Sequence, residues 1–119
     1  MKDPLDDLRF YQKALELWDL FWEDSKVLIR DIRGRKIAEQ MTKSVGSISA
    51  NIEEGYGRGY GNKEYTHFLK ISRGSASESK GWYRRANRLL PKSVASARTK
   101  LLNEVIAMLT KSIKTLERR

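Results

Sequence analysis

The 119-residue chain has no cysteine, and its only prolines are Pro4 and Pro91. The lack of cysteine excludes disulfides, thiolate nucleophiles and cysteine metal sites, and it is typical of the reducing cytoplasm, where we expect the protein to reside. No apolar run approaches the ~18 residues that a membrane span needs. The acidic start, MKDPLDDL, does not resemble a signal peptide. These absences favour a soluble globular protein with no membrane partner.

Positive charge is abundant and unevenly distributed. Lysine and arginine total 24 against 15 aspartates and glutamates, which gives a net charge of +9. Residues 1–60 carry 10 basic and 11 acidic side chains, whereas residues 61–119 carry 14 basic and 4 acidic ones. Such an imbalance favours a polyanionic partner for the C-terminal half.

Apolar residues recur at steps of three and four along most of the chain, and no strand-like alternation is present. The long proline-free stretch and the glycine cluster at 55–61 divide the chain into two helical hairpins. The sequence therefore predicts a single all-α domain, residues 1–119, folded as an antiparallel up-down-up-down four-helix bundle. The predicted helices cover about 8–32, 35–54, 62–90 and 93–118.

Capping and breaking residues set the predicted helix ends. An aspartate at position 6 or 7 is expected to cap the first helix, and Asn62 the third. Gly34 is expected in the turn that connects the first and second helices. Gly55 is expected to end the second helix, and Pro91 to end the third.

The first predicted helix has a wider apolar face than packing in a bundle requires. Trp18, Phe21 and Trp22 lie along one rim of this face. Two interpretations stay open, because aromatic residues fill protein cores and are also enriched in subunit interfaces.

Three segments carry motifs of one protein family. Residues 40–55 read QMTKSVGSISANIEEG, Phe68-Leu69 precede RGSASE at 73–78, and residues 7–14 read DLRFYQKA. In order and spacing they resemble the motifs Q-x-x-R-A-x-x-S-I-x-x-N-I-A-E-G, F-L…G-S-x-x-E and D-L-x-V-W-Q-K-A of the 23S rRNA intervening-sequence protein family. Lys43, Ser49 and Glu53 depart from the pattern, and the usual F-P motif between the first two helices is missing. The motif residues expected to be structural are Gln40, Ser47, Asn51, Glu54, Gly55, Gly74, Ser75 and Glu78.

The resemblance implies a four-helix bundle that assembles into a ring, typically a homopentamer. It also implies kinship with the accessory variability proteins of diversity-generating retroelements, which are basic proteins thought to engage a reverse transcriptase and nucleic acid. It implies no reaction.

Basic residues recur along the third predicted helix at steps near three, four or seven and should form one stripe. The predicted nucleic-acid-binding residues are Lys63, Lys70, Arg73, Lys80, Arg84, Arg85 and Arg88. The fourth helix adds Lys92, Arg98, Lys100, Lys111 and Lys114. Such stripes bind phosphates with little sequence preference. The alternative is an ordinary solvated face, which the scarcity of acids disfavours.

No catalytic residue, metal or cofactor is predicted. Asn51, Glu54 and Glu78 are better explained as polar partners that fix helix register than as acid/base carboxylates. Glu64 and His67 form one Glu-x-x-His element, but a di-metal centre needs two. We therefore expect His67 at the surface or in an interface. The glycines at 55–61 lack the preceding strand and following Lys-Ser/Thr of a phosphate loop, and they predict a hinge.

Three functional hypotheses remain. The first is a non-enzymatic oligomeric adaptor that binds RNA or DNA through its basic half and serves a nucleic-acid enzyme such as a reverse transcriptase. The second is a purely structural or protein-interaction ring without a nucleic-acid ligand. The third is an enzyme, for which the sequence offers no nucleophile, metal or acid/base pair.

Overall fold

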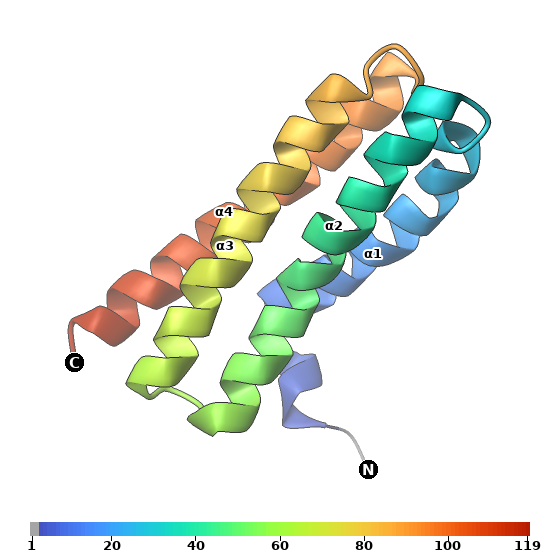
Figure 1. Cartoon of the computed structure of the whole chain (residues 1–119). Coiled ribbons are helices and arrows are strands. Elements are labelled where there is room, and N and C mark those ends of the chain that lie inside the picture. The colour runs from blue at the N-terminus through green and yellow to red at the C-terminus, as the bar shows by residue number, and fades with distance from the viewer. Residues whose placement is uncertain (1–2) are drawn as a thin grey trace.

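The computed structural model describes residues 3–119 as four long helices preceded by a short 3₁₀ helix (Figure 1). The elements are η1 (Pro4–Asp7), α1 (Arg9–Leu28), α2 (Ile32–Gly59), α3 (Lys63–Arg85) and α4 (Lys92–Glu117). Successive helices run in opposite directions, and residues 3–119 contain no strand. The predicted antiparallel all-α bundle is confirmed.

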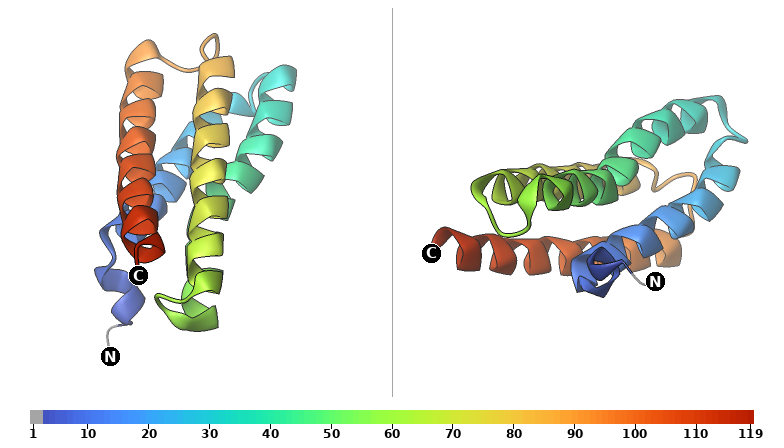
Figure 2. Two further views of the ribbon diagram at one scale, coloured as in Figure 1. Left: turned by 90° about the vertical axis from the view of Figure 1, so that its left-hand side faces the viewer. Right: turned by 90° about the horizontal axis from the view of Figure 1, so that it is seen from below.

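The four helices pack in an elongated molecule with extents of 47 × 30 × 20 Å. The α2/α3 contact is the most extensive, α4 packs against α3, and α1 packs against both α2 and α4. Figure 2 shows α3 and α4 side by side along most of their length, so together they present one broad face. Within the described chain, no helix has the length and apolarity needed to cross a bilayer.

Small polar residues let α2 and α3 approach closely. Ser72 and Ser79 of α3 are fully buried among apolar side chains. The Ser72 hydroxyl donates to the backbone carbonyl of Ile48 at 2.8 Å, and Ser79 Oγ lies 3.1 Å from Ser44 Oγ. Because the buried hydroxyls of Ser72 and Ser79 both have hydrogen-bond partners, their burial costs little free energy, and these bonds hold the two helices in register.

The predicted end of the second helix at Glu54 is wrong, and Gly55 is neither a helix stop nor a hinge. Helix α2 continues to Gly59, with Gly55 buried inside it. A Cβ atom at Gly55 would lie 2.8 Å from the Cβ of Phe68 on α3, so only glycine fits this close approach. The chain instead turns after Gly59 and at Gly61, whose φ angles are +132° and +86°.

The turn between α1 and α2 also differs from the prediction. It lies at residues 29–31, because the Asp31 carboxylate accepts the free backbone N–H groups of Arg33 and Gly34 and so begins α2 early. Gly34 is therefore inside the first turn of α2. The predicted cap on α1 is wrong as well, since Leu8 precedes α1 without a side-chain hydrogen bond and Asp3 caps η1.

The start of α3 agrees with the prediction, but its end does not. Asn62 is confirmed as the N-cap, since its side chain accepts from the N–H of Tyr65. The helix ends at Arg85 rather than at residue 90, and turns fill the segment before Pro91. Helix α4 then begins at Lys92, with Pro91 in the N-cap position.

Candidate nucleic-acid interface

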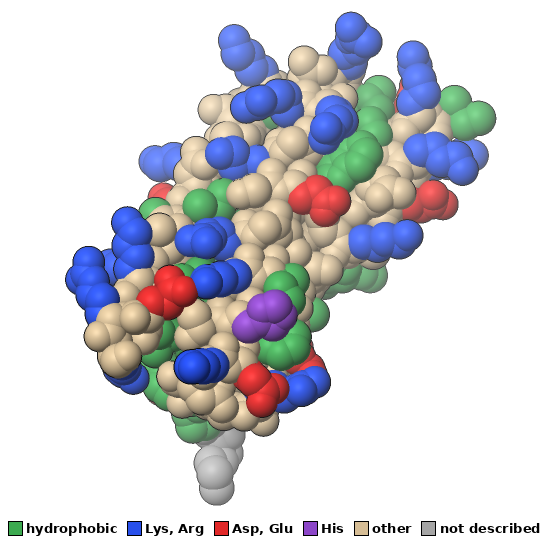
Figure 3. Space-filling model, turned by 60° about the vertical axis from the view of Figure 1, so that its left-hand side comes forward, with side chains coloured by type: hydrophobic (Ala, Val, Ile, Leu, Met, Phe, Trp, Pro, Cys, Tyr) green, Lys and Arg blue, Asp and Glu red, His purple; other side chains and the backbone are tan. Residues whose placement is uncertain are grey.

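Helices α3 and α4 and the turn between them carry a surface rich in lysine and arginine. Figure 3 shows these side chains spread over this face with few acidic ones among them. We call it the basic surface. Its members are Lys63, Lys70, Arg73, Lys80, Arg84, Arg85, Arg88, Lys92, Lys100, Lys111 and Lys114. All of them are exposed except Arg73 and Lys80, which are half-buried.

Three members of the predicted α3 stripe reach toward α4. Lys70 Nζ lies 2.7 Å from Glu117 Oε2. Arg73 donates to the Thr110 hydroxyl at 3.3 Å, and Lys80 donates to the Asn103 side-chain oxygen at 2.8 Å. The stripe therefore follows the seam between the two helices. Thr110 and Asn103 are neutral, so neither hydrogen bond offsets the positive charge of Arg73 or Lys80.

The remaining members of the predicted stripe differ in position. Lys63 and Arg84 are exposed on α3. Arg85 stacks on the ring of Trp82, with its guanidinium carbon 4.8 Å from the ring centroid. Arg88 was assigned to the stripe by helical spacing, but it lies in the turn after α3, because that helix ends at Arg85.

Three of the four acidic side chains after residue 60 already form ion pairs. Glu64 pairs with Arg58 at 3.1 Å, Glu104 with Lys13 at 3.1 Å, and Glu117 with Lys70. Two of these three partners come from the N-terminal half. Of the four acids after residue 60, the exposed Glu78 alone makes no ion pair among residues 3–119. The basic surface therefore has almost no internal counter-charge.

Arg98 does not belong to this surface, although its spacing on the fourth predicted helix placed it there. Its guanidinium points inward to Asp24 of α1, with Nε 2.8 Å and Nη2 3.1 Å from the two carboxylate oxygens. The Tyr83 hydroxyl of α3 donates to the same carboxylate at 2.6 Å. The Asp24 network thus joins α1, α3 and α4, and Asp24 is only 6% exposed.

Electrostatics in the Asp24 network follow from its burial. Hydrogen bonds to the Asp24 carboxylate raise the pKa of Arg98, so its positive charge is secured. Burial, and then the hydrogen bond to Asp24, raise the pKa of the Tyr83 phenol. Reasoning from the sequence missed this network, although Leu17, Phe21, Asp24 and Leu28 follow one apolar register at steps of four, three and four. An acidic residue within an apolar register of this kind predicts a buried charge that needs a partner.

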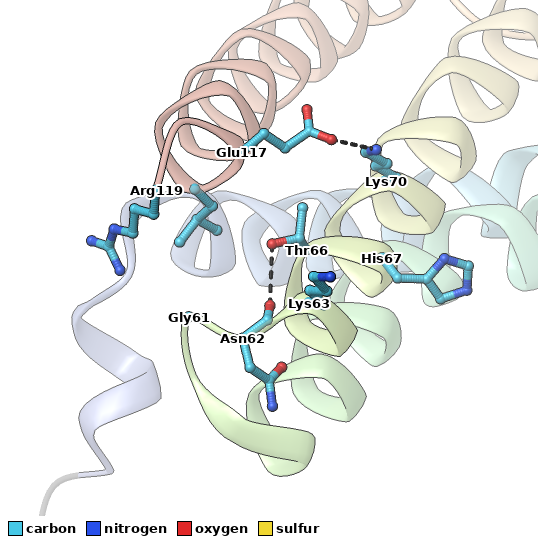
Figure 4. Close-up of a pocket in the computed structure, with 9 residues that line it drawn as sticks. Gly61, Asn62, Lys63, Thr66, His67, Lys70, Glu117 and Arg119 are labelled. Atoms are coloured by element: carbon cyan, nitrogen blue, oxygen red, sulfur yellow. Dashed lines mark hydrogen bonds and ion pairs between the residues drawn. The ribbon is translucent and has the colours of Figure 1, made fainter.

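An open pocket of about 670 Å³ lies where the start of α3 meets the end of α4 (Figure 4). Lys63, Lys70 and Arg119 line it together with the single carboxylate of Glu117. His67 is exposed at the same pocket, as expected for a surface residue. The cationic lining makes this pocket part of the same electrostatic surface.

The family-motif residues do not form an interior polar network. Asn51 is half-buried and donates to the backbone carbonyl of Ser47 in its own helix. Glu54 is exposed and pairs with Arg58 at 2.9 Å, while Glu78 is exposed on α3. Gln40 and Gly74 are exposed, and Ser47 and Ser75 are half-buried. Of this set, Gly55 alone has a clear packing role.

Among residues 3–119, no three histidine or carboxylate side chains converge to hold a metal ion. The buried titratable groups of the Asp24 network are bonded to one another, and they hold three helices together.

A compact, strongly basic four-helix bundle is therefore the class of protein that the fold and surface define. The model of the family of 23S rRNA-intervening sequence proteins matches residues 6–111, and the chain belongs to this family. A crystal structure of a protein of unknown function from the S23 ribosomal protein family of Bacteroides thetaiotaomicron is similar in fold, with a TM-score of 0.80. It is 21% identical in sequence, and the match covers 88% of this chain and 98% of that one. No curated protein matches the chain.

Proposed function

We propose that this protein binds nucleic acid through the basic surface of α3 and α4 and acts without catalysing a reaction. The observation that carries the proposal is the lack of internal counter-charge. Among residues 3–119, only Lys70 and Arg98 of the fourteen basic residues after residue 60 pair with a carboxylate.

Phosphate groups are the ligand that such a surface fits. Closely spaced cations on a rigid helical face attract a polyanion, and each phosphate that they neutralise releases condensed counterions. Binding of this kind depends steeply on salt and hardly on sequence. Lysine and arginine side chains along a straight α3/α4 seam can follow a nucleic-acid backbone over several phosphates.

The test is a salt titration of binding to a short RNA and a short DNA, measured by fluorescence anisotropy. The variant replaces Arg84, Lys111 and Lys114 by glutamine, since all three are exposed and make no ion pair among residues 3–119. Each lost phosphate contact should reduce the slope of log K against log salt by about 0.7–0.9. We expect weaker binding and a shallower slope.

The matched control replaces Arg30, Lys36 and Lys43 by glutamine. These residues are also exposed and belong to α2 and the turn before it. The control removes the same charge and should change affinity only slightly. If both variants lose affinity equally, net charge rather than the basic surface carries the binding.

An assembly of several copies is part of the proposal. Trp22 of α1 is 59% exposed, Ile29 of the following turn is 50% exposed, and Ile32, the first residue of α2, is 73% exposed. The Trp18 ring extends this apolar surface along α1, with its centroid 6.3 Å from that of Trp22, and it lies close to Gly46 of α2. An apolar patch of this kind is typical of an interaction site and favours a subunit interface.

Light scattering of the intact protein and of Trp22→Glu tests the assembly. We expect an oligomer, a pentamer by family resemblance, that Trp22→Glu converts to smaller species. A monomeric wild-type protein would contradict it. A ring that binds no nucleic acid at any salt concentration would favour the alternative of a purely structural or protein-interaction role. A reverse transcriptase partner stays a prediction of the resemblance, and co-purification with such an enzyme tests it.

A further inference from the structure

Tyr60 lies at the junction of α2 and α3, where its ring contacts neighbouring aromatic rings and is also exposed to solvent. It is 63% exposed. Its ring centroid lies 5.1 Å from that of Tyr65, which is only 2% exposed, and 5.5 Å from that of Tyr56. Contacts with two neighbouring rings restrict the motion of Tyr60, so its open side offers an aromatic surface to a ligand.

Two cationic side chains share a hollow with this ring. Tyr60, Lys111 and Arg119 line one hollow of about 220 Å³. The larger pocket with Lys63 and Lys70 adjoins it, because Arg119 lines both. The aromatic ring and the cations thus lie on one continuous surface at the end of the bundle, and Lys111 connects it with the outer face of α4.

We infer that this end of the bundle binds single-stranded nucleic acid, with one base stacked on Tyr60 and the adjoining phosphates on Lys63, Lys111 and Arg119. The inference rests on the proposed function and deepens it. Cations alone bind a duplex as well as a single strand, whereas an aromatic ring reaches the face of a base only where the bases are unstacked. Alternation of a ring with cations is the arrangement by which single-strand-binding proteins hold their ligand.

The test compares single strands with a duplex at one fixed salt concentration. The probes are an oligouridylate RNA, an oligothymidylate DNA of the same length and a blunt RNA duplex, each followed by fluorescence anisotropy. Tyr60→Ala should weaken binding of the single strands about tenfold, because one stacked base contributes about that factor or more. The duplex affinity should stay unchanged, because the cations are intact.

Two controls isolate stacking. Tyr60→Phe keeps the ring and should bind as the wild type does. Leu15→Ala truncates an exposed apolar side chain of α1, outside the proposed subunit interface, and should leave the single-strand affinity unchanged. Circular dichroism verifies that each variant is folded. A second measurement does not depend on the alanine variant: 2-aminopurine in the RNA should be quenched by wild type and by Tyr60→Phe.

The outcomes separate this inference from the proposed function. If Tyr60→Ala binds single strands as the wild type does while the Arg84, Lys111 and Lys114 variant loses affinity, the inference is wrong and the proposed function stands. If the wild type binds no nucleic acid, both fail. Equal losses for RNA and DNA assign the site to single strands of either kind, and a loss for RNA alone assigns it to RNA.

Discussion

Replacing Arg98 by alanine should be among the most destabilising changes to the charged side chains. It leaves the Asp24 carboxylate, 6% exposed, without the counterion that makes two hydrogen bonds to it at 2.8 and 3.1 Å. The Arg98 side chain is only 15% exposed, so the ion pair is largely shielded from water. Removal of one partner from such a buried pair costs about 3–5 kcal/mol. That loss is a large part of the ~5–15 kcal/mol that stabilises a domain.

Urea unfolding followed by far-ultraviolet circular dichroism measures this loss. The matched control is Lys13→Ala. Lys13 and Glu104 join the same two helices, α1 and α4, at 3.1 Å, but their side chains are 25% and 40% exposed. An ion pair with that exposure contributes less than about 1 kcal/mol. The expected result is therefore a large shift of the urea midpoint for Arg98→Ala and a small one for Lys13→Ala.

A second substitution distinguishes charge burial from lost packing. Asp24→Asn removes the charge and keeps the shape, so in the Arg98→Ala background it should restore part of the lost stability. Equal, small losses for Arg98→Ala and Lys13→Ala would refute the reasoning. An Asp24→Asn substitution that lowers stability further in the Arg98→Ala background would refute it as well.

Two further predictions concern packing and pH. Gly55→Ala should lower the free energy of unfolding by about 1–3 kcal/mol, because it overpacks the α2/α3 contact. Gly74→Ala should raise it by up to about 1 kcal/mol, because the added Cβ lies in a helix interior and meets nothing within 4 Å. Thermal denaturation of both variants checks these opposite signs. Burial raises the pKa of Tyr11 to about 12 and also raises the pKa of Tyr83. The folded state then holds protons that the unfolded chain releases above pH ~10. Stability should be complete below that pH and should fall above it by up to about 1.4 kcal/mol per pH unit for each tyrosine. Urea unfolding at a series of alkaline pH values measures this slope, and a flat profile would contradict it.

The fold is predictable from the sequence because apolar periodicity alone defines four amphipathic helices. The helix ends are less predictable, since one residue type serves several purposes. Glycine ends helices and also permits close helix packing, and at Gly55 the second use prevails because Phe68 of α3 lies opposite. The position of Phe68 relative to Gly55 is a tertiary fact that no local pattern contains. Asp31, in contrast, was a local cap signal that outweighed the neighbouring Gly34.

The basic surface is predictable in composition but not in every member. Charge counts locate it in the C-terminal half, and helical spacing groups Lys63, Lys70 and Arg84 on α3. The Arg98 side chain points inward because it hydrogen-bonds to Asp24, which lies 74 residues away in the sequence. No spacing rule within one helix distinguishes an arginine with such a distant partner from its exposed neighbours.

The salt dependence of nucleic-acid binding tests the central claim most directly. Wild-type protein should bind a short RNA with an affinity that falls steeply and log-linearly with salt. The variant that lacks Arg84, Lys111 and Lys114 should show a slope shallower by about 2–3, at about 0.7–0.9 for each lost phosphate contact. A wild-type affinity that does not change with salt, or identical slopes for the two proteins, would contradict the account.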